Sequence, residues 1–163
     1  MGFLDFFRSF TTAARAAEAT RFRALHLRVS AMRQEDVVRE VEMLIERDEF
    51  LHARLASRTT TSTDLRLPAT VAQVFAKYDS VWAGGAQVDR TLIQVFLRDR
   101  RFIQVGIDME HAAVIVSVSD EQVFVVEDDG QLQPDFGDSY PTLWHYLFEV
   151  AAQTRGIFDA PAE

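Results

Sequence analysis

LIQVFLRDRRFIQVGIDMEHAAVIVSVSDEQVFVVE, residues 92–127, is the stretch that decides the fold of this chain. It holds four short runs rich in Val, Ile and Phe, residue types that strands favour, at 92–98, 102–107, 113–118 and 122–127. Only a few residues separate each run from the next, which leaves no room for the helix that joins two parallel strands. The stretch therefore predicts a four-stranded, mainly antiparallel sheet.

Helices are predicted on both sides of this stretch, so the expected fold class is α+β. Apolar residues recur at three- and four-residue steps over 3–32 and, more regularly, over 34–55. Pro68 suits the first turn of a third helix, and Gly84-Gly85 is expected to end it. A last helix is indicated by an apolar stripe made of Leu143, Tyr146, Leu147 and Val150.

A polar run after the second helix divides the chain. Residues 59–63 read Thr-Thr-Thr-Ser-Thr and offer neither apolar periodicity nor bulk for packing. We therefore expect an N-terminal helical extension at 1–56, a linker at 57–66, an α+β domain at 67–155 and a tail at 156–163.

The charge of the chain is unevenly placed. The net charge is −8, of which residues 1–63, with ten Arg against nine acids, contribute +1 and residues 64–163, with seven bases against sixteen acids, contribute −9. An acidic domain repels phosphate backbones and attracts basic surfaces, which disfavours direct nucleic-acid binding and favours a basic protein partner. The alternative interpretation is that the charge only keeps the protein soluble.

The compartment is predicted from what the sequence lacks. The chain has no cysteine, which excludes a disulfide framework and a cysteine nucleophile and fits a reducing compartment best. The start, Met-Gly-Phe-Leu-Asp-Phe-Phe-Arg, does not resemble a signal peptide, and no apolar run approaches the length of a membrane span. We expect a cytoplasmic protein.

A search for catalytic patterns favours a protein that is not an enzyme. The four histidines are scattered, and neither His145 with Glu149 nor the group Asp108, Glu110 and His111 reaches the two or three convergent ligands of a zinc motif. Acidic residues crowd into 120–138 without the spacing of a calcium loop. Gly84-Gly85 follows a predicted helix and so is not a phosphate loop. No metal or cofactor is predicted, and an unrecognised hydrolase stays as an alternative.

Two features favour binding. Trp82 lies beside Gly84-Gly85 in a predicted loop, where it either packs in the core or contacts a partner. The first helix carries an aromatic row followed by arginines, a pattern typical of contact with a membrane surface, with a second copy of the chain or with the second helix. The row consists of Phe3, Phe6, Phe7 and Phe10.

The arrangement of residues 65–152 resembles the SUKH superfamily, which includes bacterial toxin-immunity proteins and a yeast regulator of cell-wall synthesis. The resemblance is carried by Leu67-Pro68 opening a helix, Gly84-Gly85, Phe102 to Asp108 as a strand ending in Gly-x-Asp, and Val123-Phe124 leading to Asp128-Asp129. Residues 1–63 have no counterpart in the minimal domain of that family. The resemblance implies an α+β fold that acts by binding proteins, often by neutralising a toxin such as a nuclease.

The sequence thus predicts a non-enzymatic, immunity-type module that binds a basic protein partner through an acidic surface. A nuclease must carry a basic surface to hold phosphate, so acidic side chains would match it. The alternative is a membrane-peripheral, scaffold or regulatory protein that acts through the first helix, and self-association into a homo-oligomer is left open as well. The expected partner contacts are Trp82, Glu127, Asp128, Asp129, Asp135, Asp138 and Tyr140.

Overall fold

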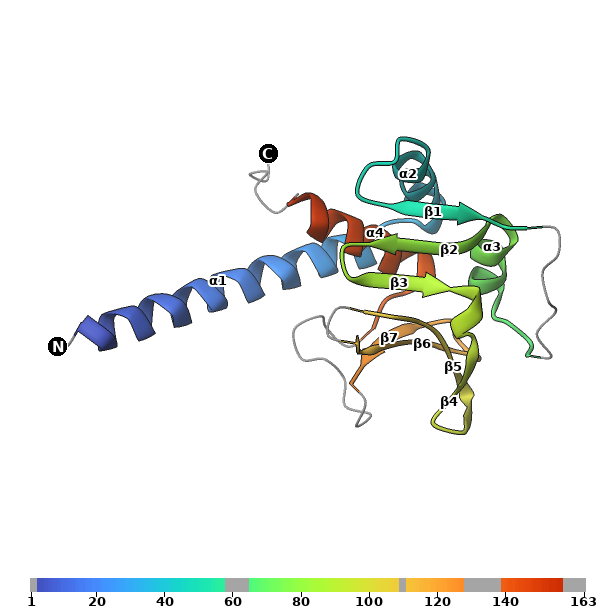
Figure 1. The fold of residues 1–163 in the computed structure, drawn as a ribbon. Helices are drawn as coiled ribbons and strands as arrows, with labels where there is room; N and C mark the ends of the chain where they lie inside the picture. The colour runs from blue at the N-terminus through green and yellow to red at the C-terminus, as the bar shows by residue number, and fades with distance from the viewer. Residues whose placement is uncertain (1–2, 58–64, 109–110, 128–138, 157–163) are drawn as a thin grey trace.

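The computed structural model describes residues 3–57, 65–108, 111–127 and 139–156, with side chains described from residue 14 onward. Figure 1 shows a curved sheet packed against helices, and one long helix that projects from this body. The described residues form four α-helices, namely α1 (Phe3–Ser30), α2 (Gln34–Glu46), α3 (Ala69–Lys77) and α4 (Leu143–Arg155).

All strand pairs of the sheet are antiparallel, and the strands follow the order β1-β2-β3-β5-β6-β7, with β4 pairing β5 beside this path. A short 3-10 helix, Arg90–Leu92, joins β3 to β4. The seven strands of the described residues are β1 (His52–Leu55), β2 (Tyr78–Ala83), β3 (Ala86–Asp89), β4 (Gln94–Phe96), β5 (Asp99–Ile107), β6 (Ala113–Ser117) and β7 (Val123–Val126).

The α+β class and the antiparallel sheet are confirmed, but the sheet has seven strands where the sequence predicted four. Two of the missed strands, β2 and β3, form a hairpin. The third helix ends at Lys77 instead of continuing to Gly84. The next residues form a strand, in which successive side chains point to opposite faces of the sheet. Gly84, with φ of +55°, forms the tight turn of this hairpin together with Gly85, because glycine adopts such angles without strain. The prediction that Gly84-Gly85 ends a helix was wrong.

The third missed strand, β1, lies where the second helix was predicted to continue to residue 55. α2 ends at Glu46, and Asp48 and Phe50 have φ of +54° and +62°, which a right-handed helix cannot contain. Residues 52–55 then pair with β2 at the edge of the sheet. The predicted extension at 1–56 therefore supplies a strand to the sheet of the predicted domain at 67–155.

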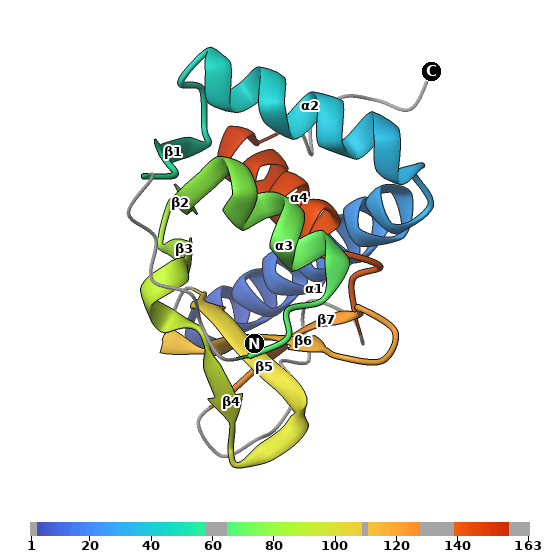
Figure 2. The ribbon, with the colours of Figure 1, turned by 90° about the vertical axis from the view of Figure 1, so that its right-hand side faces the viewer.

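The main core lies between one face of the sheet and the helices α2, α3 and α4, and Figure 2 shows these three helices together on that side. α4 is the central element because it contacts α1, α2 and α3. Its Trp144 is 1% exposed, and its indole N–H donates to Oε1 of Gln73 on α3. The predicted stripe of the last helix is confirmed, since all of its members are buried: Leu143, Tyr146, Leu147 and Val150.

The two halves of the sheet meet where β3 pairs β5 through only two residue pairs. Gly106 on β5 lies there so close to β3 that a Cβ atom would come within 2.3 Å of the carbonyl oxygen of Gln87. Any larger residue would force the backbones apart. Close packing of β3 against β5 therefore explains why glycine stands at position 106, in the Gly-x-Asp pattern.

α1 contacts the body only through its last turns in the described part of the chain. Leu25 and Val29 form a small cluster with Ala152 and the partly buried Phe148 of α4. Residues 14–20 are exposed on every side of the helix, and Figure 1 shows this part pointing away from the body. A helix of 28 residues is about 42 Å long, so α1 forms a projecting arm.

Candidate binding surface

The outer face of β1, β2 and β3 is polar and is not covered by the helices. Val81 and Val88 point into the core, so the residues that alternate with them point outward. The strand register places the outward residues in two rows across the sheet. We call these two rows the Trp82 face, which consists of His52, Trp82 and Gln87 in one row and Arg54, Ser80 and Asp89 in the other.

The first row exposes a large aromatic side chain on a rigid support. Trp82 is 38% exposed. The ring of His52 lies beside it, with 5.9 Å between the ring centroids, and Nδ1 of His52 lies 2.5 Å from Oδ1 of Asp48. Trp82 is therefore held from one side by a histidine that is itself oriented by a hydrogen bond.

The second row contains a buried carboxylate beside an exposed guanidinium. Oδ1 of Asp89 accepts hydrogen bonds from the backbone N–H (2.8 Å) and the hydroxyl (2.7 Å) of Thr91, and Oδ2 accepts one from Nε2 of Gln87 (3.0 Å). Burial works to raise the pKa of Asp89, but these hydrogen bonds and the charge of Arg54 lower it below its usual value. Asp89 therefore stays ionised at neutral pH and attracts Arg54, whose nitrogen lies 3.7 Å from Oδ2.

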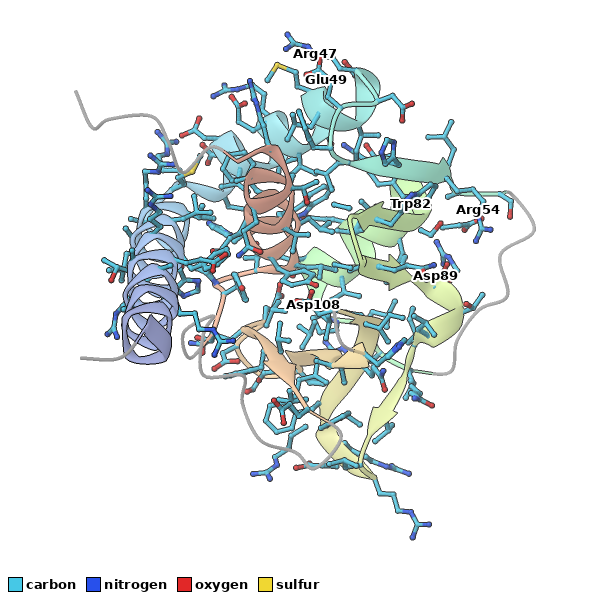
Figure 3. The ribbon with its side chains drawn as sticks, turned by 60° about the vertical axis from the view of Figure 1, so that its left-hand side comes forward. Arg47, Glu49, Arg54, Trp82, Asp89 and Asp108 are labelled. Atoms are coloured by element: carbon cyan, nitrogen blue, oxygen red, sulfur yellow. The ribbon has the colours of Figure 1, made fainter. Side chains whose placement is uncertain are left out.

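An open pocket of about 350 Å³ lies over the Trp82 face, next to the turn of the β2–β3 hairpin. Figure 3 shows Arg54, Trp82 and Asp89 together, on the opposite side of the view from α1. The pocket is lined by the aromatic Trp82, by the oppositely charged Arg54 and Asp89, and by the buried Ser80. Such a combination suits a group that is partly apolar and partly charged.

The structure separates the predicted partner contacts. Trp82 on β2 is exposed, as its predicted role as a partner contact requires. Glu127 is also exposed, but it lies directly after β7, at the other end of the sheet. Tyr140 is 2% exposed and its hydroxyl donates to Oε1 of Glu149 (3.4 Å), so its prediction as a surface contact was wrong. Four predicted contacts lie outside the described residues, namely Asp128, Asp129, Asp135 and Asp138.

For the predicted aromatic row of the first helix, the structure describes the backbone alone. Its four residues lie on α1, but their side chains are outside the described part of the structure. The members of this row are Phe3, Phe6, Phe7 and Phe10.

Sequence reasoning missed Arg54, Asp89 and the partners that hold them. Both lie on strands that the sequence did not predict, β1 and β3. A usable signal was the alternation Ser80-Val81-Trp82-Ala83 before two glycines, which is typical of a hairpin as well as of a helix end.

A second polar cluster is buried between α1 and α4. Nδ1 of His26 lies 3.0 Å from Oε2 of Glu149, while Tyr140 and Gln153 donate to Oε1. Burial raises the pKa of Glu149 above its usual value, although the hydrogen bond and charge of His26 lower it. Burial, helped by the charges of Glu149 and Asp108, raises the pKa of Tyr140 well above its usual value. Because both carboxylate oxygens of Glu149 have hydrogen-bond partners, we interpret this cluster as a structural contact that holds α1 against α4.

His145 and Glu149, one helical turn apart, do not form a joint site. Nδ1 of His145 lies 2.8 Å from the hydroxyl of Thr142, and Nε2 lies 3.1 Å from the carbonyl oxygen of Met32. Burial lowers the pKa of His145, which keeps the ring neutral at neutral pH. Within the described ranges, no group of three or more His, Asp or Glu side chains is arranged to hold a metal ion.

Three comparisons, with protein families, with curated proteins and with solved structures, gave no significant match. The resemblance to the SUKH superfamily therefore stays a prediction. In the part of the chain that the structure describes, no helix is both long and apolar enough to cross a bilayer.

Proposed function

We propose that this chain is a non-enzymatic protein-binding module of the immunity type, which neutralises a cognate toxin by binding it. The observation that carries the proposal is the exposed Trp82, which stands on a sheet face with Arg54 beside it. Tryptophan and arginine are the residue types most enriched at the energetic centres of protein interfaces. Placing them on paired strands reduces the conformational entropy that binding costs.

The distribution of charge supports a basic partner. Residues 1–33 hold six Arg against two acids, a net charge of +4, and residues 34–163 hold eleven bases against twenty-three acids, a net charge of −12. The boundary of the acidic part thus lies before α2, not at residue 64, because α2 and the turn after it are acidic too. A body of this charge attracts a basic protein over a distance of about 10 Å at moderate salt and repels nucleic acid.

Affinity capture with the full chain tests this proposal, comparing the wild type with Trp82→Ala and with Leu97→Ala. Leu97 is a matched control because it is an apolar residue, 65% exposed, on another hairpin. We expect the wild type and Leu97→Ala to retain a basic protein at low salt and to release it at high salt. Trp82→Ala should retain far less, since losing a central aromatic anchor costs about 2 kcal/mol or more.

The captured protein must also be toxic. Its expression alone should arrest growth of the host, and co-expression of the present chain should restore growth, while the Trp82→Ala variant should restore it less. Capture of no basic protein, or equal capture by the wild type and Trp82→Ala, would contradict the proposal.

We infer a second candidate function from α1, as an arm for membrane contact or self-association. Residues 14–20 are all exposed, whereas most of the stability of a helix in a protein comes from tertiary packing of one of its faces. Sedimentation with anionic vesicles and the molar mass in solution test this function in a chain that lacks residues 1–19. The deletion should stop there because Leu25 and Val29 are buried against α4. Unchanged behaviour in both measurements would exclude the arm function.

A further inference from the structure

We propose that the pocket over the Trp82 face binds a carboxylate group attached to an apolar or aromatic moiety. This inference rests on the proposed function, since it names the chemical group that a partner would place on this face. The chemistry of the pocket thus specifies the group that is bound, while the partner that carries this group is left open.

The pocket is lined by one cation, Arg54, and one anion, Asp89, and of these two groups only the guanidinium has donors left for a ligand. Both oxygens of Asp89 are already engaged by Thr91 and Gln87, so this carboxylate needs no donor from a ligand. Arg54 faces it at 3.7 Å, a distance longer than a good hydrogen bond, and its side chain is 60% exposed. A guanidinium has five N–H donors in a planar fork that matches a carboxylate. Arg54 is therefore a donor held in place and available for a carboxylate from outside.

The shape of the pocket selects an apolar group beside that anion. Trp82 lines the pocket, whereas His52, which packs against the ring, does not. Gly84 and Gly85 form the adjoining wall and have no side chains that would cover the indole. The ring thus offers an open surface on which a flat or apolar group can stack.

The size of the pocket suits a single residue of a partner. A volume of about 350 Å³ is at the lower end of the range for small-molecule sites. The group that fits is an amino-acid side chain with a nearby carboxylate, either the C-terminal residue of a partner or an apolar residue next to an Asp or Glu. These two sources share the same chemistry and are separated by the peptide arms of the experiment below.

The test uses the full chain labelled with ¹⁵N and follows its two tryptophan indole signals by NMR. N-acetyl-phenylalanine is the probe, and N-acetyl-phenylalanine amide is the control, which carries a neutral amide in place of the carboxylate. We expect the acid to shift the Trp82 signal in a saturable way and to leave the signal of the buried Trp144 in place. The amide should bind about tenfold more weakly or not at all, because it cannot accept the charge-assisted hydrogen bonds that Arg54 offers to a carboxylate.

Two variants assign the effect to its residues. Arg54→Gln should reduce the affinity for the acid by about tenfold or more. Arg101→Gln is the matched control, since Arg101 is 82% exposed and pairs with Asp99 on another hairpin, and it should bind like the wild type. An unchanged Trp144 signal shows in each case that the variant is folded. Equal shifts with the acid and the amide, an unaffected Arg54→Gln variant, or no shift with either probe would overturn the inference.

Peptides then distinguish the two sources of the carboxylate. A peptide ending in phenylalanine with a free C-terminus is compared with its amidated form and with an amidated form that carries Glu before the phenylalanine. Binding by the first alone identifies a C-terminus, and binding by the third identifies an acidic side chain. If Trp82→Ala abolishes capture of a basic toxin but none of these probes binds, the proposed function stands and the pocket inference fails.

Discussion

Glu121 caps a helix that lies far from it in the sequence. α3 begins after Pro68, which offers no side-chain acceptor for the first N–H groups of the helix. Oε1 of Glu121 accepts from the backbone N–H of Ala69 (3.1 Å), and Oε2 accepts from that of Thr70 (3.0 Å). The carboxylate also lies at the positive end of the helix dipole. We therefore predict that Glu121 stabilises the packing of α3 against the rest of the body.

The magnitude follows from these two contacts. Loss of a helix cap costs about 1 kcal/mol, and loss of the favourable charge at the helix start adds about 0.3–1 kcal/mol. Glu121→Ala should therefore lower the free energy of unfolding by about 1–2 kcal/mol at pH 7. The measurement is urea denaturation, in which the midpoint should fall while the slope stays the same. Glu127→Ala is the control, since Glu127 is exposed, and it should change the free energy by less than about 0.5 kcal/mol.

The effect of Glu121 should depend on pH. Burial works to raise the pKa of Glu121, but the hydrogen bonds from Thr70 and Ala69 lower it below the usual value of 4.5. The stabilisation is thus complete above pH 4.5 and is lost as the pH falls through the lower pKa of the folded state. The difference in unfolding free energy between the wild type and Glu121→Ala should shrink over that window. A difference that is absent at pH 7, or that stays constant into acid, would refute the reasoning.

Three further predictions follow from other contacts. Gly106→Ala should destabilise the protein by more than about 3 kcal/mol in urea denaturation, because the added Cβ would overlap a carbonyl of the neighbouring strand at 2.3 Å; an unchanged midpoint would contradict this. His26→Leu should lower the free energy of unfolding by about 3 kcal/mol at pH 8, because the buried Glu149 loses its partner. The loss should be smaller at pH 5, where Glu149 takes up a proton, and the double variant with Glu149→Leu should recover part of it. Ala16→Gly with Ala19→Gly should lower the helical circular dichroism signal while the melting temperature of the body stays the same, since both residues lie on the projecting part of α1. A lowered melting temperature would show that this part of α1 packs on the body.

Local pattern predicted the elements that bury continuous apolar runs. β5, β6 and β7 were predicted because their sequences are nearly continuous apolar runs, such as 113–118. Both faces of this part of the sheet are apolar: one face packs against the helices, and the other carries a second small apolar cluster. α4 was found because its stripe repeats at helical spacing. In these cases the residue types and the burial agree, so the sequence alone is sufficient.

β1 and β2 were missed because their residues do not show their environment locally. Val71 to Tyr78 has helical spacing, and the run from Ser80 to the two glycines fits a helix end as well as a hairpin, so it does not by itself mark Tyr78 as the end of the helix. A strand at 52–55 is formed only because β2 is available beside it, which is a contact across the predicted linker. The Trp82 face needs β1, β2 and β3, all of which were missed, so only its exposed tryptophan was predicted.

The separation of the two candidate binding elements depends on the last turns of α1. Because α1 is basic and the body is acidic, electrostatic attraction alone would draw the arm back onto the body. A continuous helix cannot bend back without breaking backbone hydrogen bonds, so its direction is set where Leu25, His26 and Val29 meet α4. Weakening the contact of His26 with Glu149 should therefore change the behaviour of the arm in vesicle binding or self-association. The binding of a carboxylate at Trp82 should stay unchanged, which makes the two functions separable by mutation.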